Sequence, residues 1–232
     1  MANAFFVTGT DTDAGKTVVT RTLIESSVRA GQKTAGFKPI ASGSTLTAYG
    51  MRNADALFLQ AASQPELQYE EVNPYTFEPP IAPHIAAKQA GISIDPVRLS
   101  EGLSKLKSKN DVVFVEGAGG WRVPLSDTMK LSDWVKQEEM AVILVVGVKL
   151  GCLNHAMLTA EAIQNDGLTL AGWVANLVDP DTHCYEDNLK YLETYLPAPK
   201  LGEIPYLPGI AKRDLTAYLN MALLAPTTSS SL

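Results

Sequence analysis

Short apolar runs alternate along this chain with segments whose apolar residues recur at helical spacing. Continuous apolar runs are typical of strands that are buried on both faces, as in a parallel sheet covered by helices. The alternation of the two predicts an α/β fold with a mainly parallel sheet and helices on both faces. The pattern predicts strands over 4–7, 33–40, 111–115, 140–148, 168–176 and 200–204. It predicts helices over 18–31, 53–62, 96–107, 154–166 and 185–195.

Two segments fall outside this alternation. Residues 72–83 contain four prolines, which exclude a long regular element, so the sequence predicts a loop there, close to the functional site. Residues 225–232 are rich in serine and are expected to form a flexible tail. Because no linker-like segment interrupts the rest of the chain, we expect a single domain over residues 1–224.

Composition narrows the class of function. The formal net charge of −6 and the pI of about 5.1 argue against a nucleic-acid partner. No apolar stretch is long enough to span a bilayer, and the N-terminal segment lacks the pattern of a signal peptide. Cys152 and Cys184 form neither a disulfide framework nor a pair at metal-ligand spacing. We therefore expect a cytoplasmic protein that acts without nucleic acid or membrane.

The segment Gly9–Thr17 lies between the first predicted strand and the first predicted helix. It ends in Gly-Lys-Thr and is typical of the phosphate-binding loop (P-loop) of nucleotide enzymes, although Thr10 stands where the first glycine is usual. The backbone N–H groups of such a loop, together with the positive end of the helix dipole, bind phosphate oxygens. The pattern predicts that Lys16 reaches the β- and γ-phosphates of ATP and that the Thr17 hydroxyl binds Mg²⁺.

Two charged residues near the ends of predicted strands are candidates for the same site. Ligands bind parallel sheets at the carboxyl ends of the strands, where Glu116 follows one apolar run and Lys38 lies late in another. A carboxylate suits Mg²⁺, the small residues 117–119 let the backbone approach a ligand, and a buried lysine needs an anionic partner. The alternatives are a strand-ending turn with a solvated glutamate, and a lysine that extends its stem to solvent.

Four further features allow more than one interpretation. Asn176 ends a predicted strand, where its amide could hydrogen-bond a nucleotide base or simply end the strand. The helix entry after Gly151 could bind a carboxylate through free N–H groups, or it is an ordinary glycine-rich start. Spacing alone selects neither Asp55 nor Ser42, because acids in a first helical turn and serines in turns are both common.

Taken together, these motifs resemble the dethiobiotin synthetase family, the ATP-dependent ring-closing enzymes of biotin synthesis. The similar segments occur in order over most of the chain, as far as Leu207, whereas residues 178–195 and the C-terminal tail depart from the family pattern. The similar segments are 7–17, 36–43, 53–57, 72–77, 115–120, 147–155, 172–176 and 202–205.

The resemblance implies a P-loop fold and a reaction. One amine of 7,8-diaminononanoate takes up CO₂ to form a carbamate, which attacks the γ-phosphate of ATP to give a carbamic-phosphoric anhydride. The second amine then closes a cyclic urea and expels phosphate. The resemblance also implies Mg²⁺ as cofactor, ATP as co-substrate, and a homodimer with its active sites near the subunit interface.

The resemblance further assigns roles to individual residues. It implies that Lys16 and Lys38 are catalytic and that Thr17, Asp55 and Glu116 bind the metal. The implied nucleotide-binding residues are Asp13, Ala14, Gly15, Lys16, Thr17, Asp55, Glu116, Gly117, Ala118, Gly119, Asn176, Leu177, Pro205, Tyr206 and Leu207. The implied substrate-binding residues are Thr12, Ser42, Gly151, Cys152, Leu153 and Asn154.

Three other functions fit parts of this pattern. An amidoligase like those of cobalamin synthesis would carry a glutaminase domain with a catalytic cysteine, for which this chain is too short. A partitioning ATPase that acts as a switch would place a second lysine early in the phosphate loop, and residues 10–14 contain none. A nucleotide-binding module without catalysis is a third alternative, and the joint presence of Lys16, Thr17, Lys38, Asp55 and Glu116 argues against it.

Overall fold

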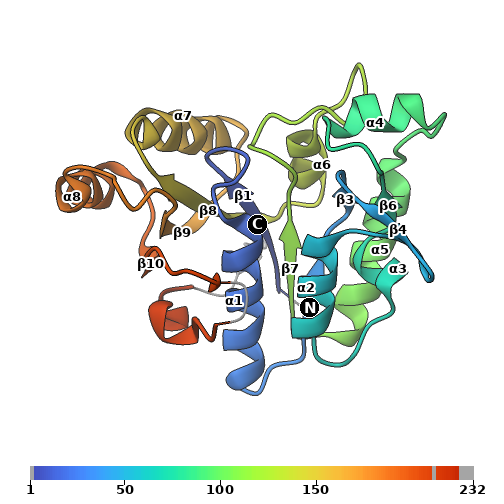
Figure 1. Ribbon diagram of the computed structural model, residues 1–232, viewed down its shortest axis with the longest axis horizontal. Helices are drawn as coiled ribbons and strands as arrows, with labels where there is room; N and C mark the ends of the chain where they lie inside the picture. Colours follow the sequence, from blue (N-terminus) through green and yellow to red (C-terminus); the bar gives the residue numbers. More distant parts are fainter. Residues whose placement is uncertain (1–2, 211–212, 225–232) are drawn as a thin grey trace, which may run out of the picture.

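The computed structural model describes residues 3–210 and 213–224, so the tail expected at 225–232 lies outside the described part of the chain. Its central element is a six-stranded parallel sheet with the strand order β10-β9-β8-β1-β7-β2 (Figure 1). This confirms the predicted α/β fold class. The strands are β1 (Asn3–Gly9), β2 (Thr34–Phe37), β7 (Val112–Glu116), β8 (Ala141–Val148), β9 (Leu170–Leu177) and β10 (Lys200–Ile204).

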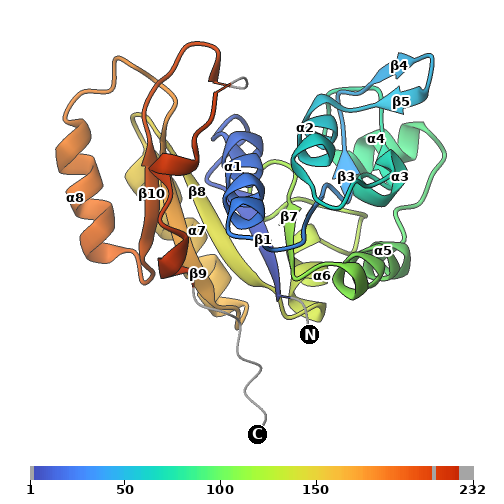
Figure 2. The same ribbon diagram turned by 90° about the horizontal axis from the view of Figure 1, so that it is seen from below.

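Helices cover both faces of this sheet. Figure 2 shows α1 in front of the strands and α7 behind them, and in Figure 1 the same two helices lie on opposite sides of the sheet. The longer helices are α1 (Lys16–Arg29), α2 (Ala54–Ala62), α5 (Pro96–Lys109), α7 (Cys152–Asn165) and α8 (Tyr185–Tyr195). The shorter ones are α3 (Tyr69–Val72), α4 (Pro83–Gln89), α6 (Leu131–Gln137) and the 3₁₀ turns η2 (Thr216–Tyr218) and η3 (Met221–Leu223). Within the described ranges, none of the helices combines the length and apolar character needed to cross a membrane.

In the edge strand β2, successive side chains point to opposite faces of the sheet and pack on different helices. Gly36 faces α1 and α2, where an added Cβ would lie 2.7 Å from Ile24 Cδ1 and 2.8 Å from Leu59 Cβ. The next residue, Phe37, faces the other side and packs on α5 at Gly102. Successive side chains of a strand point to opposite faces, so this single step separates two helical layers. Strand β8 is also covered on both faces, so it is buried along its whole length. Its sequence is therefore one continuous apolar run.

The order of the strands defines where a ligand can bind. Strand β1 lies between β7 and β8; the chain first builds the β7-β2 side of the sheet and then turns to β8, β9 and β10 on the other side. In open parallel sheets, ligands bind outside the carboxyl ends of the strands at such a switch point. The carboxyl end of β1 is where the phosphate loop begins.

Two small sheets lie outside the central one. A two-residue parallel pair joins β3 (Ile40–Ala41) to β6 (Tyr75–Thr76), and an antiparallel hairpin joins β4 (Thr45–Thr47) to β5 (Gly50–Arg52). The proline-rich segment 72–83 begins with the last residue of α3 and ends with the first residue of α4; between them it contains β6 and otherwise has the predicted loop character.

Several predicted boundaries were wrong. The second predicted strand ends at Phe37, because Pro39 has no N–H for the ladder and the residue before a proline is restricted in conformation. Helices α1 and α7 begin two residues before the predicted positions, directly after Gly15 and Gly151, whose φ angles are 91° and 92°. The short helices α3, α4 and α6 were not predicted, because their few residues give too little periodicity to detect.

We predict that Gly36→Ala destabilises the protein by about 1–3 kcal/mol. The added methyl group would overlap Ile24 and the Cβ of Leu59, and a Cβ cannot move away by rotation of its side chain. Urea unfolding followed by circular dichroism measures the change. Gly120→Ala is the matched control, since the nearest heavy atom to its added Cβ would be 3.6 Å away. Equal unfolding free energies for the two variants would contradict this account of the helix–sheet packing.

Candidate active site

The phosphate loop leaves β1 at Gly9 and enters α1 at Lys16. Two residues of the loop have left-handed backbone conformations, Asp13 with φ of 59° and Gly15 with φ of 91°. Strand β8 fixes the start of the loop, since Thr10 N donates to Val145 O at 2.9 Å and Gly147 N donates to Thr10 Oγ1 at 3.2 Å. Two hydrogen bonds to β8 therefore fix the start of the loop.

Lys16 is buried beneath this loop. Its ammonium donates to the main-chain oxygen of Asp11 at 3.0 Å. Burial, and then repulsion by the ammonium of Lys38, lowers the pKa of Lys16 to about 8. Two buried ammonium groups near each other are a suitable environment for a polyanion such as a triphosphate.

The predicted Lys38 and Glu116 come together because their strands are adjacent. In the sheet Phe37 is paired with Val115, so the next residue of each chain segment emerges at the same level. Lys38 Nζ lies 2.5 Å from Glu116 Oε1, 3.3 Å from Asp55 Oδ2 and 3.2 Å from Gly117 O. Burial alone would lower the pKa of Lys38, but the carboxylates of Glu116 and Asp55 outweigh it and raise this pKa above its ordinary value. Lys38 is therefore a fixed cation.

The predicted metal ligands are linked to one another through Glu116 and Lys38. The hydroxyl of Thr17 donates to Glu116 Oε1 at 2.8 Å, and Asp55 is joined to the cluster through Lys38. Glu116 is completely buried, yet its second oxygen, Oε2, has no hydrogen-bond partner among the described residues. Hydroxyl and carboxylate oxygens are the ligands that Mg²⁺ prefers, and it usually takes only one or two protein carboxylates together with substrate phosphates. This donor set fits magnesium.

The glycine-rich run after β7 lies against the phosphate loop. Gly117 N donates to Val7 O at 3.0 Å, and a Cβ on Gly117 would lie 2.8 Å from the ring of Phe6. A Cβ on Gly119 would lie 3.8 Å from Thr12 Oγ1. The small side chains therefore allow two loops from neighbouring strands to approach each other.

Two further predicted residues have polar atoms that no protein group satisfies. Ser42 Oγ and Asn176 Oδ1 are both buried and without a hydrogen-bond partner in the described part of the chain. Asn176 Nδ2 donates to Ala14 O at 3.0 Å, and the amide lies directly over Gly15, where any Cβ would overlap it. Unsatisfied buried oxygens are costly, so a ligand that donates hydrogen bonds would stabilise both.

Other predicted residues are not joined to this cluster. Among the described residues, no hydrogen bond or ion pair links the helix entry at 151–154 or the segment 205–207 to Lys38, Asp55 or Glu116. The neighbouring Lys149 contacts the phosphate loop, where its ammonium lies 3.8 Å from Asp11 Oδ2. Predicted residues that make no hydrogen bond or ion pair to those three residues, within the described ranges, include Leu177, Gly151, Cys152, Leu153, Asn154, Pro205, Tyr206 and Leu207.

Sequence reasoning missed residues that shape the site. Asp11 holds Lys16 through its main-chain oxygen, and Thr10 fixes the loop to β8. Asp11 gives no signal in the sequence, because a contact made by a main-chain oxygen does not depend on the type of side chain. Thr10 gives none, because it stands where a glycine is usual. Asn53 caps α2 by accepting from Ala56 N at 3.2 Å, and an asparagine directly before a helical pattern could have been read as an N-cap.

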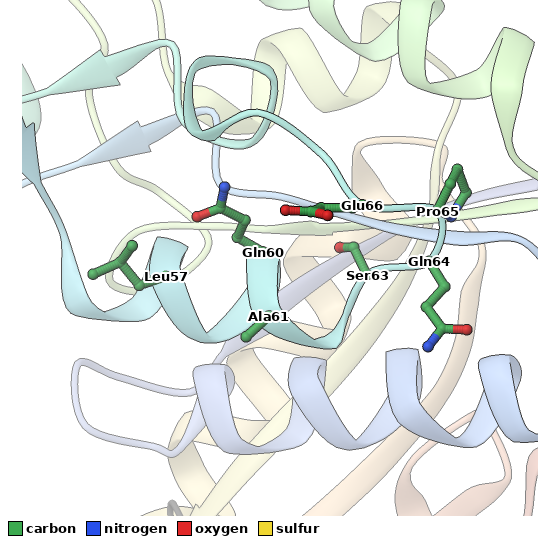
Figure 3. Close-up of a pocket in the computed structure, with 7 residues that line it drawn as sticks. All are labelled: Leu57, Gln60, Ala61, Ser63, Gln64, Pro65 and Glu66. Atoms are coloured by element: carbon green, nitrogen blue, oxygen red, sulfur yellow. The ribbon is translucent and has the colours of Figure 1, made fainter. Parts of the chain in front are cut away.

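A separate cavity of about 720 Å³ is lined by residues of α2 from Leu57 onward and by the segment that follows this helix (Figure 3). Its lining is uncharged except for Glu66, and it shares no residue with the phosphate-loop cluster. The convergence of buried charges therefore locates the candidate active site at the carboxyl ends of β1, β2 and β7, away from this cavity.

Two solved structures with the same fold are far removed in sequence. A MinD protein from Pyrococcus horikoshii, solved with Mg-ADP, is 18% identical, with a TM-score of 0.57 over 96% of this chain and 89% of that one. A ParA-family ATPase from Chlorobium tepidum is 13% identical, with a TM-score of 0.59 over 97% of this chain and 98% of that one. At this level of identity the likeness shows the fold alone.

Sequence relatives are much closer. A family model described as an AAA domain matches residues 3–214. A protein of Photobacterium profundum named ATP-dependent dethiobiotin synthetase BioD is 60% identical over 90% of this chain and 96% of its own length. A protein of Vibrio cholerae with the same name is 51% identical over 98% and 99%. On its sequence and its phosphate-loop site, this chain belongs to the dethiobiotin synthetase family.

Proposed function

We propose that this protein is the ligase that closes 7,8-diaminononanoate with CO₂ and ATP to give dethiobiotin, ADP and phosphate in biotin biosynthesis. The observation that carries the proposal is the buried ammonium of Lys38, held by Glu116 and Asp55 at the strand edge where the phosphate loop begins. The names of relatives that are 51% to 60% identical support the same reaction.

The reaction needs two activations. One amine of the substrate attacks the carbon of CO₂ and loses a proton, giving a carbamate. A carbamate oxygen attacks the γ-phosphorus of ATP, the bond to ADP breaks, and a carbamic-phosphoric anhydride forms. The second amine attacks the carbonyl carbon, loses a proton and expels phosphate, which closes the cyclic urea.

The central difficulty is that two anions must meet. The carbamate and the γ-phosphate repel each other in water, and fixed cations in a buried site lower that barrier. Lys16 is suited to the β- and γ-phosphates because it lies under the loop. Lys38 is suited to the transferring phosphoryl group and the carbamate, because its buried ammonium is held between the carboxylates of Glu116 and Asp55 beside the phosphate loop.

We assign the metal site to Thr17, Asp55 and Glu116. Mg²⁺ bound there would neutralise charge that develops on the phosphate oxygens. The unpartnered Oε2 of Glu116 supports this assignment, since a buried carboxylate oxygen without a donor has capacity for a cation. Thr17 and Glu116 are already oriented towards each other by their hydrogen bond.

The remaining roles are assigned from unsatisfied groups and helix geometry. Ser42 and Thr12 are proposed to contact the diamine, and the free N–H groups at 151–154 its carboxylate. Asn176, with the segment 205–207, is proposed to bind the adenine, which the unpartnered Asn176 Oδ1 supports.

The acidic composition and the absence of a disulfide between the two cysteines are consistent with the cytoplasmic location that we propose.

The test of this function is phosphate release from Mg-ATP and bicarbonate, with and without the diamine. We expect release that depends on the diamine, together with a cyclic urea detected by mass spectrometry. Release that ignores the diamine would contradict the proposal.

Lys16→Ala should lower the rate by at least about 100-fold, because it removes a charge at the γ-phosphate. Lys105 is an exposed lysine on α5, and Lys105→Ala is the control that should leave the rate unchanged.

We predict that Glu116→Gln raises the Mg²⁺ concentration needed for half-maximal activity by about 10- to 100-fold, the loss typical when a group that supports a metal site is removed. The variant keeps the size of the side chain but removes its charge. A titration of initial rate against Mg²⁺ measures the effect, with the exposed Glu101→Gln on α5 as control. An unchanged magnesium requirement would exclude Glu116 as a ligand.

We also propose a homodimer in which the helix entry of one subunit completes the site of its partner. Exposed apolar side chains beside that entry, Leu150 at 98% and Leu158 at 56% of their full exposure, support association there. We expect sedimentation to show a dimer and specific activity to fall on dilution to the monomer. A monomer with full specific activity would overturn this part of the proposal.

A further inference from the structure

The main chain of Lys38 is held by a segment outside the central sheet. Strand β2 ends at Phe37, so the sheet ladder does not fix Lys38. Instead, Lys38 N donates to Val72 O at 2.8 Å, and Lys38 O accepts from Asn73 Nδ2 at 2.6 Å. Both main-chain hydrogen bonds of the site lysine therefore go to one dipeptide at the end of α3.

Asn73 uses its full hydrogen-bonding capacity. Its Nδ2 donates to Lys38 O and to Tyr75 O at 3.0 Å, while its Oδ1 accepts from the Tyr69 hydroxyl at 2.8 Å and from Thr76 Oγ1 at 2.9 Å. Main-chain oxygens can only accept, so the amide has a single orientation that satisfies all four partners. The side chain is buried, with 2% of its surface exposed.

The same network reaches the start of α2. The Tyr69 hydroxyl, which donates to Asn73, also accepts from Asn53 N at 2.8 Å. The Asn53 side chain then caps α2 through Ala56 N and donates to Ser42 O at 3.2 Å. Asp55 lies in the first turn of that helix, two residues after the cap.

We propose that Asn73 is the positioning residue that sets the ammonium of Lys38 against the carboxylate of Asp55. Its Nδ2 holds the Lys38 main chain, and its Oδ1 holds the start of α2 through Tyr69 and Asn53. The inference rests on the proposed function, because its consequence is a slower chemical step. A buried polar network with every member satisfied specifies one geometry, whereas apolar packing of the same volume would not.

The chain offers a matched control for this role. Asn110 is another buried asparagine, at the end of α5, and its Nδ2 donates to Leu106 O at 2.8 Å. Its Oδ1 has no partner, and within the described residues it makes no hydrogen bond to the active-site cluster. Asn110→Ala therefore removes a buried amide without touching Lys38.

The test compares Asn73→Ala with Asn110→Ala in the diamine-dependent assay, with kcat, the KM for ATP and the folded fraction measured for each. We expect Asn73→Ala to lower kcat by about 10- to 100-fold, the loss that a misplaced catalytic group produces. The KM for ATP should change little, because β8 and not Asn73 holds the phosphate loop. Asn110→Ala should leave kcat unchanged. Equal kcat values for the wild type and folded Asn73→Ala would overturn the inference.

A double-mutant cycle distinguishes positioning from general support. If Asn73 acts through Lys38, then adding Asn73→Ala to Lys38→Ala should lower kcat little further, whereas independent effects would multiply.

Should Asn73→Ala fail to fold, Tyr69→Phe takes its place, since it removes only the hydroxyl that joins Asn73 to Asn53. We expect a lower kcat at an unchanged KM for ATP. Full kcat in folded Tyr69→Phe would overturn the inference.

Failure of the proposed function has a different outcome. If the wild-type protein forms no cyclic urea from the diamine, the function itself is wrong and the positioning role falls with it. If the wild type forms the product and the folded Asn73 and Tyr69 variants match its kcat, only the positioning role is wrong.

Discussion

The contact between the ammonium of Lys38 and the carboxylate of Glu116 is the interaction on which the rest of the site depends. Their side chains are 5% and 0% exposed, and two charges taken out of water are costly unless each is closely paired. The adjacent ends of β2 and β7 provide that pairing, and Thr17 and Asp55 are joined to the same two groups. Loss of either partner would leave a buried, uncompensated charge in the middle of the site.

A reason for keeping such a costly arrangement follows from the reaction. Fixed charges that need no rearrangement stabilise a transition state better than water, which must reorient around it. Lys38 is fixed at both ends, because carboxylates hold its ammonium and Asn73 holds its main chain. Lys16 is held by Asp11 in a loop that β8 fixes. The protein thus prepares positive charge for two anions that would otherwise repel each other.

The sequence predicted much of the fold and part of this cluster. Apolar runs identified the six strands of the central sheet, and the rule for carboxyl ends correctly predicted that Lys38 and Glu116 would lie together. Asp55 could not be found by spacing, because its place depends on how α2 packs on β2. Asn73 and Tyr69 gave no periodic signal, since their role lies in contacts between segments distant in the chain. The roles of the segments 151–154 and 205–207 remain predictions of the family resemblance.

The path of one oxygen atom shows whether the carbamate attacks the γ-phosphate. If the carbamate attacks the γ-phosphate, an oxygen from CO₂ becomes part of the phosphate that ring closure releases. The enzyme would be given CO₂ labelled with ¹⁸O in ordinary water, and the phosphate would be analysed by mass spectrometry at short times. We expect one labelled oxygen in each phosphate that accompanies a cyclic urea. Unlabelled phosphate, formed together with dethiobiotin, would contradict it.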